Sequence, residues 1–274
     1  MSLREVFMPS YKRLLIASAK GGVGKSTTAA GLAYTYASAG KRVLLLDLDF
    51  TGRCLDMLTG CDSAVFDFSD VLLGRDISEA ASAGVGGCTA LSLLTACTAQ
   101  QFHDAALSLG LDERSALREA VGRILADDGY DIVIADTGAG ISAAESCADL
   151  FDMVLITSEQ SRTSIRAAEY AAQRINACGA RVIRLVICSF DLTAVKREHI
   201  AGIIEMIDES SLACLGAVPF DKKLQKSQDA GTLPHSSSLS MKAYANIAAR
   251  LEGNEVPLFW NMKELRRKRN AALR

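Results

Sequence analysis

Apolar runs alternate along this chain with stretches whose apolar residues recur at helical spacing. Some of the runs are almost continuously aliphatic, as at residues 43–46 and 132–134, which is typical of parallel strands covered by helices on both faces. Runs of this kind predict seven strands, at residues 13–18, 42–47, 89–95, 131–136, 153–157, 182–188 and 212–218. The alternation predicts a mostly parallel sheet built from βαβ units.

Longer helices are predicted between these strands. They span residues 25–39, 113–127, 141–150, 162–177, 193–209 and 237–251. Gly40, Gly129 and Gly179 stand where helices commonly end. Residues 60–110 are the least regular part of the chain, and there we expect short helices and mobile loops.

These elements fit one domain of the α/β class. The chain has 274 residues, of which 49% are apolar, enough for a sizeable core. We expect a doubly wound, mostly parallel sheet of about seven to eight strands over residues 1–252, followed by a tail over residues 253–274. The net charge of −2 does not indicate a nucleic-acid binder, but residues 263–274 carry six basic side chains and one acidic one, a local charge of +5.

The cysteines and the N-terminus bear on the compartment. None of the eight cysteines forms a C-x-x-C pair or is spaced with histidines as zinc ligands are. The N-terminus has no apolar signal segment, and no run of eighteen apolar residues occurs. We therefore expect a cytoplasmic protein in a reducing compartment.

One loop carries the strongest chemical signal, because it joins the first predicted strand to the first helix. Its glycines let backbone N–H groups surround phosphate oxygens, Lys25 supplies a charge for the outer phosphates, and the Ser26 hydroxyl is a Mg²⁺ ligand. The helix directs its positive end at the same anion. We therefore expect a P-loop for ATP and Mg²⁺. The expected nucleotide-binding residues of the loop are Gly21, Gly22, Val23, Gly24, Lys25, Ser26 and Thr27.

A second lysine, Lys20, precedes Lys25 by five residues and is not needed to bind phosphate within its own loop. It points outward from a loop already filled by phosphate. One interpretation is a contact with a nucleotide that another subunit holds. The other is a solvated loop lysine, and the residues alone leave both open.

Three acids follow predicted strands next to this loop. Asp47 and Asp49 end the second strand and Asp136 ends the fourth. Ligands of open α/β sheets bind beyond the carboxyl ends of the strands, so these acids are expected to face the phosphates. One acid of the first pair could hold Mg²⁺ through water while the other orients the attacking water, and Asp136 has the position of a Walker B acid. Ordinary strand-end capping is the alternative. The small residues 138–140 form a natural switch loop beside a γ-phosphate.

Residues 19–28, with Asp47-Leu48-Asp49, resemble the deviant Walker A ATPases, which are the MinD/ParA family of P-loop NTPases. The similarity is greatest to the MinD branch, the septum-site regulators, and it covers nearly the whole chain. The segments that carry it further are residues 47–56, 136–141, 215–221 and 254–257.

The resemblance implies a single doubly wound domain and assigns roles within it. Lys20 would reach the partner's phosphates across an ATP-sandwich homodimer, and Lys25 would bind those of its own subunit. Ser26, Asp47 and Asp136 would hold Mg²⁺ and its water shell, and Asp49 would position the hydrolytic water. The implied function is a Mg²⁺-dependent ATPase that cycles between a free monomer and a dimer bound to membrane or to regulatory protein partners, in spatial regulation of cell division.

Two positions depart from the family pattern. Gly138 stands where the family usually carries proline, which predicts a more flexible switch loop. Cys188-Ser189 replaces an Asn-Arg pair whose asparagine reads adenine, and a thiol is a poor substitute for an amide that both donates and accepts. The rest of the pattern still favours ATP.

The third departure is the tail, where the family's MinD members carry an amphipathic helix that binds acidic lipid. Over residues 258–274 one apolar face is expected at helical spacing, made of Leu258, Met262, Leu265, Ala272 and Leu273. Arg269 falls within that face and makes it imperfect. A helix that binds anionic lipid peripherally and reversibly, a solvated terminus and a nucleic-acid contact are the three interpretations.

Other functions share the nucleotide residues. A ParA-like partition ATPase would bind DNA, with Lys222, Lys223 and Lys226 as part of its basic surface, and a flagellar-placement ATPase belongs to the same family. A relative of nitrogenase iron protein would bridge a metal cluster through cysteines, but Ala143 stands where one would be expected and Cys147 lies four residues beyond it.

Overall fold

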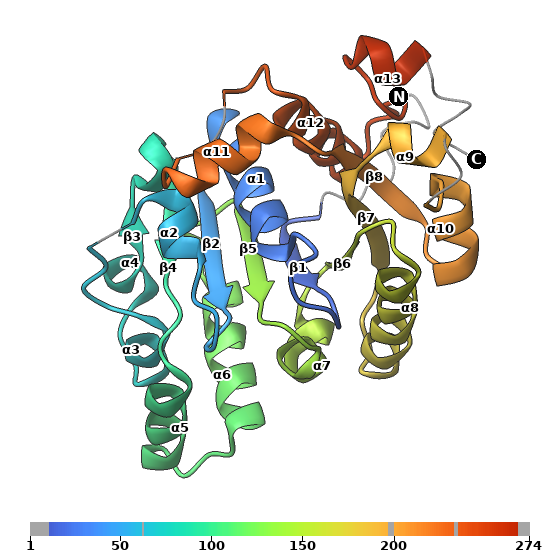
Figure 1. The fold of residues 1–274 in the computed structure, drawn as a ribbon. Coiled ribbons are helices and arrows are strands. Elements are labelled where there is room, and N and C mark those ends of the chain that lie inside the picture. Colours follow the sequence, from blue (N-terminus) through green and yellow to red (C-terminus); the bar gives the residue numbers. More distant parts are fainter. Residues whose placement is uncertain (1–10, 62, 197–199, 233–234, 268–274) are drawn as a thin grey trace, which may run out of the picture.

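The computed structural model describes residues 11–61, 63–196, 200–232 and 235–267. They form one eight-stranded sheet with helices on both faces (Figure 1). The strand order is β3-β4-β2-β5-β1-β6-β7-β8, and all neighbours are parallel except β3 and β4. The strands are β1 (Arg13–Ala17), β2 (Val43–Leu48), β3 (Ser82–Ala83), β4 (Leu91–Leu94), β5 (Ile132–Thr137), β6 (Met153–Ser158), β7 (Ile183–Phe190) and β8 (Cys214–Pro219).

The expected fold class is confirmed, and each of the seven predicted strands is present. β3 is an addition, because a two-residue strand is too short to leave a periodic signal in the sequence. It pairs antiparallel with β4 at the edge of the sheet. The inner strands β2, β5 and β6 are buried at every residue, as their near-continuous apolar runs predict.

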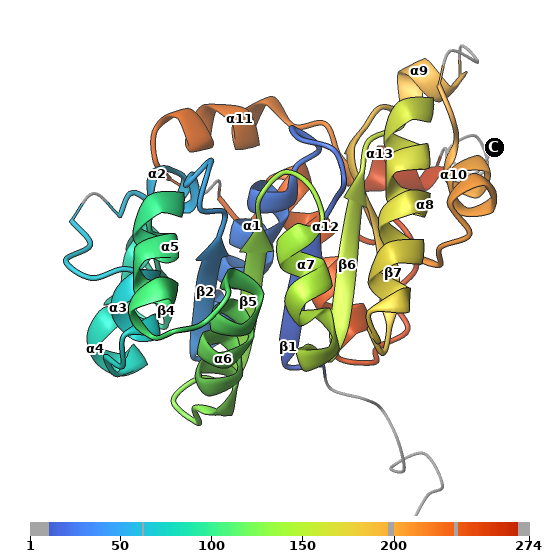
Figure 2. The ribbon, with the colours of Figure 1, turned by 90° about the horizontal axis from the view of Figure 1, so that it is seen from below.

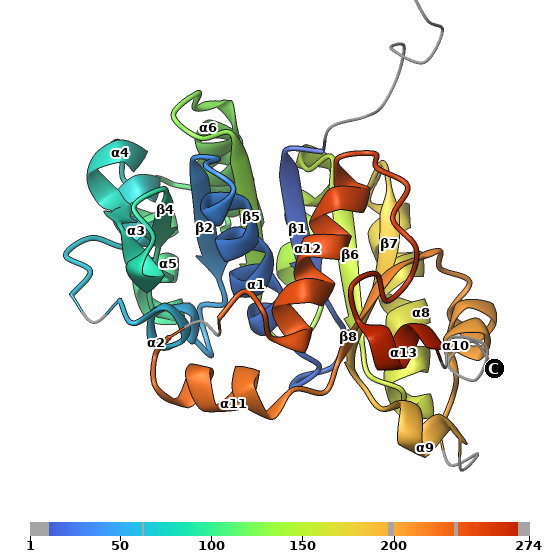
Figure 3. The same ribbon diagram turned by 90° about the horizontal axis from the view of Figure 1, so that it is seen from above.

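Two layers of helices cover the sheet. α1 (Lys25–Ser38) and α12 (Leu239–Leu251) lie on one face, and α6 (Glu113–Ala126), α7 (Ser142–Cys147) and α8 (Arg162–Ala177) on the other (Figures 2 and 3). In α6 and α8 the buried residues recur at helical spacing and the remaining positions face solvent. The core therefore consists of two apolar layers, one on each side of the strands.

The strand order places the functional loops together. β1 lies in the middle of the sheet between β5 and β6, and β5 also pairs with β2. The chain passes from β1 to one side of the sheet to form β2 and β4, and later builds β6, β7 and β8 on the other side. Such a change of direction opens a crevice at the carboxyl ends of the strands. The loops after β1, β2 and β5 meet there.

The remaining helices are short or irregular. They are α2 (Leu55–Thr59), α3 (Phe68–Leu72), α4 (Ile77–Ala80), α5 (Ala99–Ser108), α9 (Leu192–Lys196), α10 (Ile203–Ser210), α11 (Lys222–Asp229) and α13 (Lys263–Arg267), with 3-10 turns at Val85–Gly87 and Ala148–Leu150. Several of them occupy residues 60–110, as the sequence predicts.

The prediction of a single helix over residues 193–209 is wrong. Two helices, α9 and α10, replace it, and residues 197–199 between them lie outside the described part of the chain. Gly202 takes an extended conformation, with φ −80° and ψ 176°, and is the N-cap of α10. The Ala201 carbonyl accepts a hydrogen bond of 2.8 Å from Gln160 Nε2, which fixes the break against the end of β6.

The first part of the tail packs on the domain. Phe259 and Met262 are 1% and 3% exposed, and the Phe259 ring lies 5.5 Å from that of Phe190 on β7. The Arg250 guanidinium donates to the carbonyls of Val256, Pro257 and Leu215 at 2.8–3.0 Å. The boundary at residue 252 stays a prediction, and so does an apolar face over 258–274, because residues 268–274 lie outside the described chain.

A close contact between α1 and α12 generates a stability prediction. A Cβ built on Gly31 would overlap the buried ring of Tyr244. Gly31→Ala should therefore lower the free energy of unfolding by about 1–3 kcal/mol through overpacking, although alanine favours helices intrinsically. Urea denaturation at equilibrium measures the change.

The matched control is Gly122→Ala in α6, where an added Cβ meets nothing within 4 Å. That variant should be unchanged or more stable by up to about 1 kcal/mol. Equal stability of the two variants would contradict the packing of Tyr244 against α1.

Candidate functional site: a phosphate cleft at the end of β1

The loop between β1 and α1 has the geometry of an anion site. Gly22 and Gly24 have φ values of +75° and +87°, a left-handed conformation that glycine adopts without strain. Gly24 is the N-cap of α1, and among the described residues no side chain caps that helix end. The N–H groups of the first turn are therefore available to an anion at the positive end of the helix.

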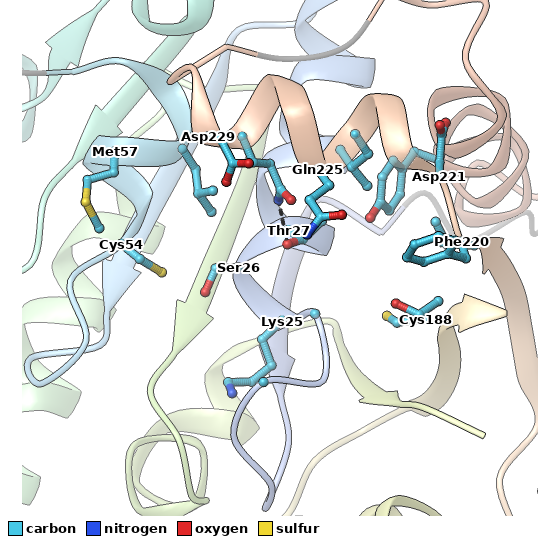
Figure 4. A pocket seen from close by; sticks show the side chains of 18 of the residues that line it. Lys25, Ser26, Thr27, Cys54, Met57, Cys188, Phe220, Asp221, Gln225 and Asp229 are labelled. Atoms are coloured by element: carbon cyan, nitrogen blue, oxygen red, sulfur yellow. Dashed lines mark hydrogen bonds between the residues drawn. The ribbon is translucent and has the colours of Figure 1, made fainter. Parts of the chain in front are cut away.

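A cleft of about 1040 Å³ opens in front of this loop (Figure 4). α11 runs along its other side, and Gln228 Nε2 donates a hydrogen bond of 2.7 Å to Thr27 Oγ1. At one end of the cleft the turn after α11 lies against the end of α2. A Cβ built on Gly60, the C-cap of α2, would lie 2.6 Å from the carbonyl oxygen of Gly231, which follows α11. The predicted nucleotide-binding residues that line the cleft are Gly21, Gly22, Gly24, Lys25, Ser26 and Thr27.

Val23 does not line this cleft. Its side chain is 1% exposed, so only its backbone is available to a ligand. Lys25, by contrast, is 7% exposed and extends into the cleft next to Ser26 (Figure 4). A nearly buried ammonium group without a carboxylate partner closer than 4 Å among the described residues is suited to an anionic ligand.

Asp47 and Asp136 lie side by side, because they are register partners on β2 and β5. They are 2% and 0% exposed. Burial raises the pKa of Asp47 to about 7 and raises that of Asp136 well above its usual range, and the neighbouring charge of Asp47 adds to the rise at Asp136. The Ser26 hydroxyl and the Lys25 ammonium act in the opposite direction on the pKa of Asp136.

The carboxylate of Asp136 fits a cation. Neither of its oxygens has a hydrogen-bond partner among the described residues. Asp47 Oδ1 accepts a bond of 2.9 Å from the Asp49 N–H. Two buried acids beside a serine hydroxyl supply the oxygen ligands and the charge that Mg²⁺ prefers. Ser26, Asp47 and Asp136 are the residues that would hold it or order its waters.

Asp49 lies one residue beyond β2 and lines the cleft. Its Oδ1 accepts hydrogen bonds from the N–H groups of Thr51 at 3.1 Å and Gly52 at 2.7 Å. These bonds fix the direction of the side chain. Gly138, in the loop that follows β5, packs against the same carboxylate.

Lys20 points away from the cleft toward the first turn of α8. Its ammonium Nζ lies 2.8 Å from Ser164 Oγ, 3.4 Å from Thr163 Oγ1 and 3.5 Å from Ser161 Oγ. Ser161 is the N-cap of α8, so this helix end repels a cation. Three neutral hydroxyl groups therefore hold Lys20 at an unfavourable place for its charge.

Cys188 is at the base of the cleft, as Figure 4 shows. Its Sγ lies 3.4 Å from Thr28 Oγ1, and a Cβ on Gly24 would lie 3.2 Å from the thiol. Burial raises the pKa of the thiol to about 12. The side chain thus packs beneath the phosphate loop as a neutral group. Ser189, with φ +52°, is the exposed member of the pair.

Sequence reasoning missed the walls that α2 and α11 supply. The residues concerned are Cys54, Met57, Leu58, Phe220, Leu224, Gln225, Gln228 and Asp229. α11 has one buried residue, Leu224, so hydrophobic periodicity gives no signal for it. A cap signal exists, because Asp221 is its N-cap and accepts from the Lys223 N–H at 2.9 Å.

Neither a cluster of three or more metal-binding side chains (His, Cys, Asp or Glu) nor a helix with the length and apolar character to cross a bilayer occurs within the described residues.

Comparison with known proteins gives consistent results. A family model described as "ParA: NUBPL iron-transfer P-loop NTPase" matches residues 10–252. The septum site-determining protein MinD of Synechocystis sp. is 28% identical over 250 residues, which cover 89% of this chain and 90% of that protein.

Solved structures show the same similarity. MinD of Aquifex aeolicus has a TM-score of 0.77 at 26% identity, over 89% of this chain and 98% of that one. The MinC:MinD complex of the same organism has a chain with a TM-score of 0.77 at 27% identity, over 89% and 97%. The family model, the doubly wound sheet and the glycine-rich loop before α1 agree, and the chain belongs to the ParA family of P-loop NTPases.

Proposed function

We propose that this protein is a MinD-like ATPase that hydrolyses ATP with Mg²⁺ and takes part in the spatial regulation of cell division. The observation that carries the proposal is the pairing of Asp47 with Asp136 at the end of the sheet, beside a helix N-terminus with free N–H groups. An anion site next to two buried carboxyl groups matches a nucleotide phosphate chain bridged to a divalent cation.

Within this proposal the residues of the cleft divide the chemistry among them. Lys25 and the first turn of α1 bind and orient the phosphates. Bound Mg²⁺ would neutralise charge on the β- and γ-phosphates. Asp47 and Asp136 would hold the ion or order its waters, and Asp49 presents a carboxylate oxygen to the attacking water.

Lys20 acts between subunits in this proposal. Hydroxyl oxygens at a helix N-terminus hold an ammonium weakly, whereas a phosphate oxygen carries a full charge. A second subunit that offers its bound triphosphate would therefore draw Lys20 away from Ser164. The ATP-bound state is then a homodimer, and hydrolysis returns it to monomers.

The tail supplies the membrane contact in this proposal. Lys263, Arg266 and Arg267 are exposed, while Phe259 and Met262 are buried in the domain. Each basic residue near an anionic leaflet contributes about 1 kcal/mol, and a dimer presents two tails. Peripheral, reversible association of a cytoplasmic protein with the inner face of the membrane is therefore expected to be electrostatic at first and to require the dimer.

A regulatory protein partner is part of the proposal. MinD of Aquifex aeolicus, of which this chain covers 97%, was solved in complex with MinC. A partner of that kind that recognises the ATP-bound dimer would couple the nucleotide to the division site.

The main alternative is a partition ATPase bound to DNA, favoured by one observation. Lys222, Lys223 and Lys226 are exposed together on α11, beside the cleft. An iron-transfer role has less support, because Cys147 is buried and its Sγ donates to the Ala143 carbonyl at 3.2 Å within α7. A cysteine that bridges two subunits has to be at the surface.

Lys20→Ala should abolish ATP-dependent dimerisation and leave the affinity of the monomer for nucleotide within about twofold, because Lys20 does not line the cleft. Light scattering after size exclusion and nucleotide titration measure the two properties. Lys12→Ala, a change of a lysine outside the cleft, is the control. A dimer that survives the loss of Lys20 contradicts its role between subunits.

Asp47→Asn should stabilise the protein in EDTA at pH 8, by at most about 4 kcal/mol, and the gain should vanish near pH 4. Because the pKa of Asp47 is raised to about 7 in the folded protein, burying this side chain costs nothing below pH 4, where it is protonated in both the folded and the unfolded state. The folded state loses stability as the pH rises toward and through 7, because the unfolded chain ionises Asp47 more readily. Asparagine remains neutral over this range and keeps the oxygen that accepts from Asp49.

Thermal unfolding across this pH range gives the measurement. Mg²⁺ with a nonhydrolysable ATP analogue should reverse the order at pH 8, because asparagine cannot supply the charge. If the melting temperatures of wild type and variant depend on pH in the same way, the ionisation of Asp47 does not destabilise the folded protein.

Full-length protein should sediment with vesicles of anionic lipid in ATP and not in ADP, and truncation after Met262 should abolish sedimentation. This truncation keeps the packed Phe259 and Met262 and removes the exposed basic residues. Vesicles of neutral lipid are the control. ATP-dependent, salt-sensitive DNA binding that persists after the truncation would instead support the partition function.

A further inference from the structure

The Asp49 carboxylate lies between two glycines that come from different parts of the chain. Gly52 follows it in the same loop, and Gly138 follows β5. A Cβ on Gly138 would lie 2.7 Å from Asp49 Oδ1 and 3.1 Å from its Cγ. A Cβ on Gly52 would lie 2.5 Å from Oδ2 and 3.1 Å from Cγ. Contacts this short exclude any side chain at either position while Asp49 stays in place.

Backbone conformation does not explain these two glycines. Neither Gly52 nor Gly138 has a positive φ, in contrast to Gly22 and Gly24. A φ outside the left-handed region does not by itself call for glycine. The space that Asp49 takes up is therefore what requires glycine on both sides of it.

The same arrangement leaves the two oxygens of Asp49 with different surroundings. Oδ1 accepts from the N–H groups of Thr51 and Gly52, so its lone pairs are used. Oδ2 accepts no hydrogen bond from any described residue and belongs to a side chain that lines the cleft. Only one oxygen remains to accept a bond from water, and its direction is fixed by the other.

We propose that Gly52 and Gly138 are positioning residues for hydrolysis: together they form a seat that holds the Asp49 carboxylate with Oδ2 toward the reacting water. The proposal rests on the proposed function, in which Asp49 orients that water. It also gives the glycine at 138 a physical role, because a proline there would carry a Cβ into Oδ1 just as alanine would.

The seat predicts an unusual kind of defect. The atoms that a new Cβ would meet belong to a short side chain at the edge of a cleft, so rotation of Asp49 relieves the clash at little cost to the fold. Gly31 differs, since its neighbour is a buried ring. Alanine at 52 or 138 should therefore leave stability almost unchanged and displace the carboxylate.

The position of the carboxylate can be followed without hydrolysis. In ¹⁵N-labelled full-length protein, Asp49→Ala removes the acceptor of the Thr51 and Gly52 amide protons and should shift both resonances upfield. Gly138→Ala should shift the same two resonances in the same direction, and Gly122→Ala should shift neither. Unmoved resonances in Gly138→Ala would overturn the seat, whatever the activity.

Hydrolysis then tests what the seat is for. Asp49→Ala, Gly138→Ala and Gly52→Ala should each lower kcat by at least about tenfold, with nucleotide affinity and melting temperature close to wild type. The double variant with Asp49→Ala and Gly138→Ala should be no slower than Asp49→Ala alone, because both changes remove one interaction. Gly122→Ala is the control that keeps full activity.

The outcomes separate the two proposals. If Asp49→Ala abolishes hydrolysis while Gly138→Ala shifts the amide resonances and keeps the wild-type kcat, the positioning role is wrong and the proposed function stands. If Asp49→Ala hydrolyses ATP like the wild type, the role of Asp49 and the positioning role fail together. If the wild type itself shows no ATPase activity, the proposed function fails.

Discussion

The burial of two neighbouring carboxyl groups, Asp47 and Asp136, is the constraint on which the rest of this site depends. Parallel pairing of β2 with β5 sets them opposite each other, and a sheet covered on both faces removes them from water. Burial disfavours the ionised form and raises the pKa of each, so that two ionised carboxylates in such a place need a cation. Under the proposed function a divalent ion held with a phosphate chain would satisfy that requirement.

Much of the fold follows from short-range patterns in the sequence. The aliphatic runs identify seven strands because buried parallel strands tolerate little else. Prediction fails where the deciding contact is tertiary. The helix at 193–209 is interrupted at Gly202, and Gln160 holds that break from 41 residues away. α11 is missed because it buries only Leu224 and lies on α2 and the phosphate loop.

The candidate site divides in the same way. Asp47, Asp49 and Asp136 can be placed from the sequence because strand ends of an open sheet meet at one edge. The side chains that surround each of these groups cannot be predicted from the sequence in the same way. Ser164 is 144 residues from Lys20, and Thr28 is 160 residues from Cys188, yet each pair is in contact. The departure at Cys188 therefore concerns packing beneath Gly24 as much as recognition of a base.

Lys20 and Asp49 share one physical property that connects nucleotide chemistry to assembly. In this structure each charged group is held by neutral donors or acceptors of its own chain, Lys20 by hydroxyl groups and Asp49 by two backbone N–H groups. Contacts of this kind fix direction and hold a charge less strongly than an opposite charge does. In the proposed dimer the triphosphate of the second subunit would compete for the lysine, whereas nothing anionic would compete for the seat of Asp49. Under the proposed function the lysine would move on assembly while the carboxylate stays in place, so the group that senses a second subunit would be separate from the group that directs water.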